Sequence, residues 1–173
     1  LKIDVNAVIA SKSERLAKVT PKFVVNWLKR VVHQDDLNSI LEFSDGALDV
    51  DFADKVLQWL NVKSNVKFTD RGSLDPQGRY IFVSNHPLGG LDGLIMISIL
   101  GKLMGKIKFV VNDLLLNVVP MRGLFVPVNK HGRMGREYGE MIHNAYASDS
   151  QILYFPAGLC SRLINGEIKD LQW

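Results

Sequence analysis

The fold is indicated most clearly by residues 80–97, which read YIFVSNHPLGGLDGLIMI. The apolar residues 80–83 predict a buried strand, and the apolar run that begins at Leu94 predicts a helix. Between them, a glycine-rich turn carries His86 near the end of the strand and Asp92 near the start of the helix. A strand that leads through a short turn into a helix is the repeating unit of α/β folds with parallel sheets.

The rest of the second part of the chain repeats this alternation. Its pattern predicts strands at 66–69, 107–111, 124–128 and 151–155, and helices at 92–104 and 133–147. Pro127 indicates that its strand ends there or lies at a sheet edge. We therefore predict an α/β fold with a mostly parallel, mixed sheet flanked by helices.

The first third of the chain predicts helices only. One helix is expected to begin at Pro21 after a Thr20 cap, with Phe23, Trp27 and Val31 forming an apolar stripe. Two further helices are predicted near 35–45 and 51–60. We place a helical N-terminal subdomain at 1–62 and the α/β domain at 63–173. The stripe is expected to pack on the α/β domain. A membrane-facing role is the alternative, because Lys22, Lys29 and Arg30 accompany it.

The composition excludes several classes of protein. With 47% hydrophobic and 23% charged residues, the chain is not a disordered one. A net charge of +3 suits a phosphate-bearing ligand or an anionic membrane. The sequence shows no basic face with interleaved aromatic residues, so it does not predict nucleic-acid binding. The single cysteine, Cys160, excludes an intrachain disulfide framework and a cysteine zinc cluster, and favours the cytoplasm. No apolar stretch reaches the roughly 18–20 residues of a spanning helix, and no signal peptide is visible.

His86 and Asp92 are the residue types of a general base and its orienting carboxylate. A neutral imidazole can take a proton from a hydroxyl, while a carboxylate on the other ring nitrogen fixes the tautomer and stabilises the imidazolium. Gly89 and Gly90 permit the turn that would bring them together, and the N–H groups of the following helix can bind an oxyanion or a phosphate. The plainer interpretation is a polar residue at a strand end and a helix cap.

Two later segments have groups that suit an anionic ligand. Residues 155–162 read FPAGLCSR, where a strand ends at a Pro-Gly turn and Arg162 can hold a phosphate through two hydrogen bonds. Residues 121–130 read MRGLFVPVNK, where Arg122 and Lys130 bracket a strand. An ordinary strand exit and a solvated edge are the structural alternatives.

In this order, the three segments resemble the sequence blocks of the glycerolipid acyltransferase superfamily, which includes bacterial lysophosphatidate acyltransferases. The first block of that family is an Asn-His motif with a downstream Asp, matched by Asn85, His86 and Asp92. Its middle block ends in a basic residue after an apolar strand, matched by Gly123, Phe125, Val126 and Lys130. Its third block typically reads FPEGTRS, against FPAGLCS at 155–161.

The chain departs from the family pattern within these blocks. Five residues separate His86 from Asp92, where the family has four, and Ala157 and Cys160 replace the usual Glu and Arg. Arg162 can stand in for that arginine. The departures resemble a divergent branch of bacterial hemolysin-like proteins and O-acyltransferases of ornithine or glycine lipids, whose acceptor has no glycerol phosphate. The chain starts with Leu1, and the family's final block is not evident before its end, so the chain is a piece of a longer protein or the block has diverged.

The resemblance implies direct acyl transfer from an acyl thioester, of acyl carrier protein or coenzyme A, to a hydroxyl of a lysolipid. It implies that His86 is the base and that Asp92 orients it, without a covalent intermediate, cofactor or metal. It assigns substrate binding to Asn85, Gly89, Gly90, Arg122, Lys130, Pro156, Gly158, Ser161 and Arg162. The expected partners are the thioester, the lysolipid and a membrane surface, with no nucleic acid. The expected location is the inner face of the cytoplasmic membrane, peripherally bound.

Two other functions are compatible with the same residues. A non-catalytic lipid-binding module on the same scaffold would explain Ala157 and the longer spacing between His86 and Asp92. A thiol hydrolase would use Cys160 with His86, although a lone cysteine is more often a small buried residue. A phosphate-loop nucleotide enzyme is not supported, because residues 132–136 lack the required Gly-Lys-Ser/Thr ending.

Overall fold

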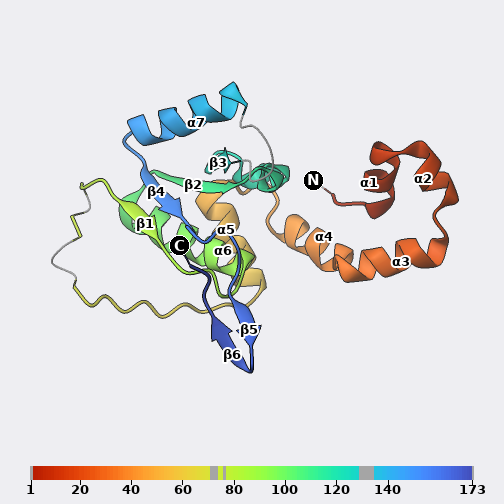
Figure 1. The fold of residues 1–173 in the computed structure, drawn as a ribbon, viewed down its shortest axis with the longest axis horizontal. Helices are drawn as coiled ribbons and strands as arrows, with labels where there is room; N and C mark the ends of the chain where they lie inside the picture. The colour runs from red at the N-terminus through yellow and green to blue at the C-terminus, as the bar shows by residue number, and fades with distance from the viewer. Residues whose placement is uncertain (1, 71–73, 76, 129–134, 173) are drawn as a thin grey trace. The chain divides into compact units, whose positions relative to one another are not determined.

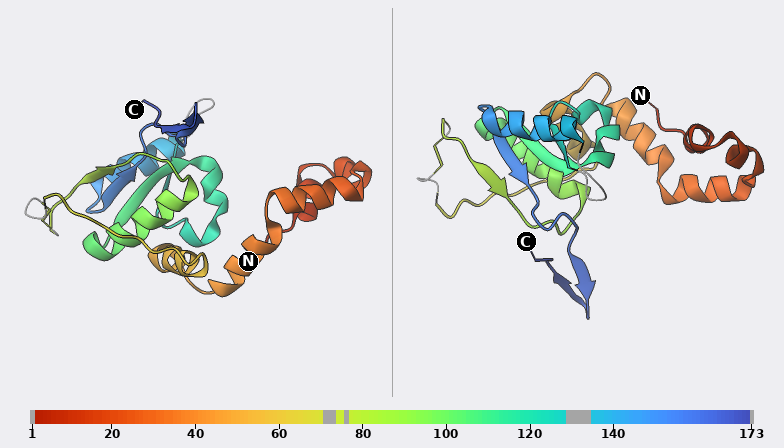
Figure 2. Two further views of the ribbon diagram at one scale, coloured as in Figure 1. Left: turned by 90° about the horizontal axis from the view of Figure 1, so that it is seen from below. Right: turned by 45° about the horizontal axis from the view of Figure 1, so that its top comes forward.

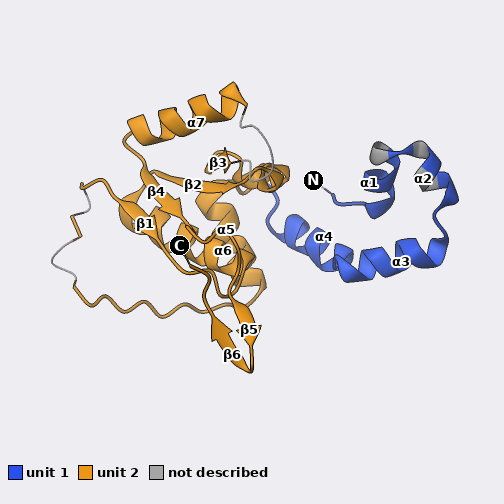
Figure 3. Cartoon of the chain, in the orientation of Figure 1, with its two compact units in different colours: residues 1–46 blue, residues 47–173 orange. Residues whose placement is uncertain are grey.

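A computed structural model describes residues 2–70, 74–75, 77–128 and 135–172 (Figure 1). The chain forms two compact units, residues 1–46 and residues 47–173 (Figure 3). The predicted boundary lay between residues 62 and 63. The structure instead places the boundary between residues 46 and 47, so the helix at 49–59 belongs to the second unit.

Unit 1 is helical, as predicted for the first part of the chain. Its helices are α1 (Val5–Lys12), α2 (Glu14–Val19), α3 (Lys22–Val31) and α4 (Gln34–Phe43). Helix α3 begins one residue later than expected, because Pro21 itself is the extended N-cap residue in place of Thr20. His33, in the left-handed region with φ of 52°, forms the turn between α3 and α4.

The apolar stripe of α3 is exposed. The exposed fractions of Phe23, Trp27 and Val31 are 74%, 60% and 53%. Unit 1 therefore does not bury this stripe in its own interior. None of the helices in the described ranges combines the length and the apolar character that crossing a bilayer requires.

Unit 2 contains a parallel sheet with the strand order β1-β4-β2-β3. The strands are β1 (Ile81–Val83), β2 (Ile107–Asn112), β3 (Phe125–Val128) and β4 (Gln151–Tyr154), and all three pairings are parallel. The predicted α/β fold is confirmed. Pro127 lies in β3 at one edge of the sheet, where a residue without an N–H costs no ladder hydrogen bond on its open side.

Helices cover both faces of the sheet (Figures 1 and 2). Helix α7 (Arg136–Ala147) packs on one face, where Ala145 joins a buried cluster with Val110, Val126 and Ile152. Helix α6 (Gly90–Met104) packs on the other face and is covered in turn by α5 (Asp49–Trp59). Short 3-10 helices, η1 (Asp113–Asn117) and η2 (Val119–Met121), connect β2 to β3.

Helix α5 belongs to unit 2 because of what it buries. Phe52, Ala53, Val56 and Leu57 form its buried face. Its polar side also contacts α6, since Asp54 accepts hydrogen bonds from Ser98 Oγ (2.5 Å) and Lys102 Nζ (2.8 Å). Helical periodicity alone predicts the helix correctly but does not reveal which unit its apolar face contacts.

Two segments differ from the predicted elements. Residues 66–69 form no strand, and Val66 and Phe68 remain 40% and 39% exposed. After β4, the chain forms an antiparallel hairpin that the sequence analysis did not predict, with strands β5 (Arg162–Ile164) and β6 (Glu167–Lys169). The turn between them is Asn165-Gly166, both with positive φ (53° and 81°), which is the most favourable dipeptide for a tight hairpin.

Candidate functional site

The candidate site lies beyond the carboxyl ends of β1 and β4. These strands are neighbours with Val83 opposite Tyr154, so the loops that follow them emerge side by side. Open parallel sheets commonly bind ligands beyond the carboxyl ends of their strands. The two loops are joined directly, because the N–H of Ser161 donates to the carbonyl oxygen of His86 at 3.0 Å.

His86 and Asp92 are in contact. His86 Nδ1 lies 3.2 Å from Asp92 Oδ2, and the two side chains are largely buried, at 18% and 13% exposed. Asp92 sits in the first turn of α6, where a carboxylate is favoured by the helix dipole. The same oxygen accepts the N–H of Leu88 at 2.7 Å, which closes the turn. The five-residue spacing therefore still permits the contact, with Gly89 at φ of 67° making the reversal.

Phe155 fixes the other side of the imidazole. Its ring stacks on that of His86, with 4.4 Å between centroids and 23° between planes. Phe109 packs edge-on against Phe155 at 5.3 Å, and a Cβ at Gly93 would come within 3.0 Å of Phe109. The ring under His86 is thus held by β2 and the start of α6. The sequence analysis quoted Phe155 only as part of the motif at 155–162 and did not predict this role.

Asp170 is a second residue that sequence reasoning missed. Its Oδ2 accepts a hydrogen bond from Asn85 Nδ2 at 2.5 Å, and its Oδ1 accepts one from Ser161 Oγ at 2.5 Å. It lies directly after β6, so the hairpin carries it back to the His86 loop. The Asn-Gly turn of the hairpin was the sequence signal that could have indicated this return.

Most of the predicted site residues lie in the two loops beyond the carboxyl ends of β1 and β4. Gly89 is the N-cap residue of α6 and Gly90 its first residue, and Gly158 closes a turn by donating its N–H to the Phe155 carbonyl at 2.9 Å. Pro156 lies within that turn, and Arg162 is the exposed first residue of β5.

Arg122 does not join this group. It precedes β3, so it lies at the amino ends of the parallel strands, opposite the edge that carries His86. Its Nε donates to the carbonyl oxygen of Leu116 at 2.5 Å. Lys130 itself lies outside the described residues.

Cys160 is exposed and close to the site without taking part in the His86 contacts. Its Sγ lies 3.5 Å from the position that a Cβ on Gly89 would occupy. No hydrogen bond joins it to His86, whose Nδ1 is used by Asp92. The described side chains also contain no cluster of three or more His, Cys, Asp or Glu residues that could hold a metal ion.

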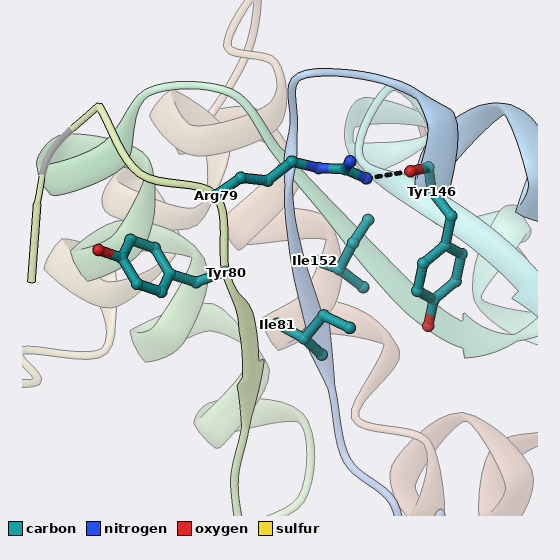
Figure 4. A pocket seen from close by; sticks show the side chains of 5 residues that line it. All are labelled: Arg79, Tyr80, Ile81, Tyr146 and Ile152. Atoms are coloured by element: carbon teal, nitrogen blue, oxygen red, sulfur yellow. Dashed lines mark hydrogen bonds between the residues drawn. The ribbon is translucent and has the colours of Figure 1, made fainter.

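An open pocket of about 500 Å³ lies at the opposite end of β1 and β4 (Figure 4). It is lined by Arg79, Tyr80, Ile81, Tyr146 and Ile152. The Arg79 guanidinium donates to the carbonyl oxygen of Tyr146 across it. The lining has no nucleophile or base comparable to the His86–Asp92 pair, so the pocket is not the candidate site.

A comparison with known protein families gives a match that covers nearly the whole chain. A family model described as "Acyltransferase" matches residues 7–173. The chain belongs to this acyltransferase family. The match extends over residues of unit 1 as well as over the α/β unit. The resemblance recognised from the three sequence blocks is confirmed.

Two curated relatives of this acyltransferase chain are named lyso-glycine lipid O-acyltransferase. The protein from Bacteroides thetaiotaomicron is 44% identical over 172 residues, which cover 99% of this chain and 62% of the relative. The protein from Phocaeicola vulgatus is 43% identical over 99% of this chain and 61% of its own length. The chain therefore spans about three-fifths of the length of these relatives. No solved structure matches it significantly.

Proposed function

We propose that this chain carries the catalytic centre of an O-acyltransferase, which moves a fatty acyl group from an acyl thioester to a hydroxyl of a lysolipid. The contact between His86 Nδ1 and Asp92 Oδ2, at 3.2 Å, is the observation on which the proposal depends. Within the described residues, His86 Nε2 has no hydrogen-bond partner, so it is available to a substrate hydroxyl. Membership of the acyltransferase family supports the reaction class.

His86 acts as a general base in this mechanism. Nε2 takes the proton of the acceptor hydroxyl as its oxygen attacks the thioester carbonyl carbon. Asp92 holds the proton on Nδ1 and stabilises the imidazolium that forms. The tetrahedral intermediate then collapses, the C–S bond breaks, and the imidazolium returns the proton to the departing thiolate. No acyl-enzyme forms and no cofactor is needed.

Backbone N–H groups at the start of α6 stabilise the oxyanion. The proposed donors are the N–H groups of Gly90 and Leu91 in the first turn of α6, because the first N–H groups of a helix have no partner within it. Gly90 has open space where a side chain would stand, which allows a substrate to approach the backbone.

The proposed donor is a thioester of acyl carrier protein or coenzyme A, and the proposed acceptor is a lysolipid with an amino-acid head group. Both relatives are named after a lyso-glycine lipid acceptor. Ala157 and Cys160 are consistent with an acceptor that lacks a glycerol phosphate, because neither carries the charge of the residue usual in the family.

A matched pair of histidine variants tests the proposal. The protein is incubated with acyl carrier protein or coenzyme A thioesters and a panel of lysolipids, and the products are identified by mass spectrometry. His86→Ala is expected to abolish transfer while preserving the fold. His33→Ala is the control, because His33 makes a similar contact with Asp36 (3.1 Å) in unit 1, far along the chain from the motifs. Lipid binding without any turnover would instead favour a non-catalytic module.

We further propose that α3 binds an anionic membrane surface at the inner face of the cytoplasmic membrane. Phe23, Trp27 and Val31 are exposed on one side of the helix, and Trp27 suits the boundary between lipid and water. Arg30 borders this side of the helix, while Lys22 and Lys29 lie on its opposite, polar side, and all three add attraction to anionic lipids.

Liposome co-sedimentation tests the membrane proposal. Trp27→Glu is expected to reduce binding to anionic vesicles at least tenfold. Val66→Glu, which adds the same charge at an exposed apolar residue of unit 2, is expected to leave it nearly unchanged. Equal effects of both variants, or equal binding to neutral and anionic vesicles, would contradict the assignment to α3.

A further inference from the structure

The carboxylate of Asp170 occupies two hydrogen-bond donors beside the catalytic loop. One of its oxygens accepts from the Asn85 amide and the other from the Ser161 hydroxyl, each at 2.5 Å. A planar carboxylate is well matched to two donors that approach its two oxygens separately. All three residues are accessible to solvent, so the donors are able to exchange partners.

These donors are adjacent to the proposed base. Asn85 precedes His86 in the chain, and the backbone N–H of Ser161 donates to the carbonyl oxygen of His86 at 3.0 Å. A ligand bound to both donors would therefore lie next to the imidazole that takes the acceptor's proton.

The hairpin continues this surface with apolar side chains. Leu163 and Ile168 are directly opposite each other in β5 and β6, and they are 73% and 68% exposed. Because side chains alternate along a strand, this pair lies on the same hairpin face as Ser161 and Asp170. Polar donors followed by an exposed apolar pair are complementary to an amphiphile with a small charged head group.

We propose that Asn85 Nδ2 and Ser161 Oγ form the subsite for the carboxylate of the acceptor's head group. Asp170 fills this subsite when no acceptor is bound, and the acceptor's carboxylate displaces it. The inference rests on the proposed function, since an amino acid whose amine is acylated keeps a free carboxylate. Asp170 stands in for that group, and Leu163 with Ile168 contacts the acyl chain beyond it.

Equilibrium binding and transfer are measured with two acceptors. One is glycine whose amine is acylated by a hydroxy fatty acid, and the other is its primary carboxamide. The variants are Ser161→Ala and Asp170→Ala. The matched controls are Ser39→Ala, an exposed serine of α4, and Asp149→Ala, an exposed aspartate at the amino end of β4. Thermal unfolding of each variant checks that the fold is retained.

The expected result is a carboxylate preference that depends on Ser161. The unaltered protein should bind the glycine acceptor at least tenfold more tightly than the carboxamide, and Ser161→Ala should remove most of that ratio. Asp170→Ala should lower KM for the glycine acceptor several-fold, because a competing anion is gone, with little change for the carboxamide. Both controls should keep the original ratio.

Other outcomes would overturn the inference. Equal binding of the two acceptors, or a loss at Ser161→Ala that is the same for both, would exclude a carboxylate subsite. A fall in kcat with unchanged KM in Asp170→Ala would make Asp170 a purely structural link between the loops. Transfer without discrimination contradicts the subsite and leaves the proposed function intact. Carboxylate-selective binding without transfer would support the subsite and contradict the proposed function.

Discussion

The ring of Phe155 stacks on the imidazole of His86, with 4.4 Å between their centroids. Phe155 follows β4 directly and is buried, whereas His86 belongs to the loop after β1. A residue that directly follows the inner strand β4 therefore sets the orientation of a side chain in the loop after the edge strand β1.

Phe155→Leu is expected to lower kcat about tenfold with little change in KM, because Leu preserves apolar volume and removes the flat surface that orients the imidazole. Its stability should fall by about 1 kcal/mol. Phe125→Leu is the control, since Phe125 is equally buried and packs on Phe109 at 6.1 Å rather than on His86. A similar loss of kcat in both variants would show that the effect is on the core alone.

Asp92→Asn is expected to lower kcat by about 10⁴-fold, by analogy with the effect of the same change in Ser-His-Asp hydrolases, where it favours the wrong imidazole tautomer. The amide oxygen can still accept the N–H of Leu88, so the turn should persist. Asp36→Asn alters the comparable His33 contact and should leave turnover unchanged. Turnover above a tenth of the original in Asp92→Asn would argue against the orienting role.

Gly101→Ala is expected to destabilise the protein by about 1–3 kcal/mol in urea unfolding. A Cβ there would lie 2.5 Å and 2.8 Å from the two γ carbons of Val50, a stiff β-branched side chain. Val50→Ala should recover most of the loss in the double variant. Gly139→Ala in α7 meets nothing within 4 Å and should instead gain up to about 1 kcal/mol from helix propensity. Additive single effects at residues 50 and 101 would contradict the close packing.

Asp49→Asn is expected to raise the unfolding free energy at pH 7. Burial raises the pKa of the Asp49 carboxyl above its ordinary 3.8, although Lys108 opposes the shift. The folded state thus binds this proton more tightly than the unfolded state, and stability falls as pH rises through the folded pKa. The gain from Asn should vanish below about pH 3.8, where both forms are neutral.

Asp149→Asn is expected to change the unfolding free energy at pH 7 in the opposite direction, by lowering it. Its hydrogen bond with Lys106 lowers the pKa of Asp149, so this carboxylate stabilises the fold at neutral pH and loses that effect in acid. The two variants should therefore diverge at pH 7 and converge in acid, as measured by urea unfolding across pH. A pH-independent difference from the original protein would point to packing rather than charge.

Cys160→Ala is expected to retain turnover within twofold, because Cys160 makes no hydrogen bond to His86. A bulky maleimide on Cys160 should nevertheless inhibit strongly, since Sγ lies beside Gly89 at the start of α6. A small methylthio adduct should inhibit much less. Loss of activity in Cys160→Ala itself would instead support the alternative in which Cys160 acts as a nucleophile.

Local patterns predicted the parts of the fold that local physics controls. The strand–turn–helix around His86, the strands at 107–111 and 151–155, and the edge position of Pro127 all follow from apolar periodicity and backbone chemistry. The contact between His86 and Asp92 was predictable for the same reason, because both residues belong to one turn.

The remaining features depend on contacts between distant parts of the chain. Asp170 is 85 residues from Asn85, and its role arises only because a hairpin returns it to the site. The stacking of Phe155 on His86 depends on β1 pairing with β4 rather than with the strand next in sequence. Alternation at 66–69 predicted a strand, but no sequence pattern shows whether a strand finds a neighbour in the sheet.

The connection between Asn85 and Asp170 has a consequence for the order in which the protein is built. During synthesis, the His86 turn leaves the ribosome long before β4 and the hairpin, and β1 has no parallel neighbour until then. Long-range parallel pairings form late, because the intervening loop must close first. On the nascent chain the imidazole therefore has Asp92 of its own turn beside it, but it gains the Phe155 ring only when β4 pairs with β1, and Asn85 gains Asp170 only when the hairpin folds back.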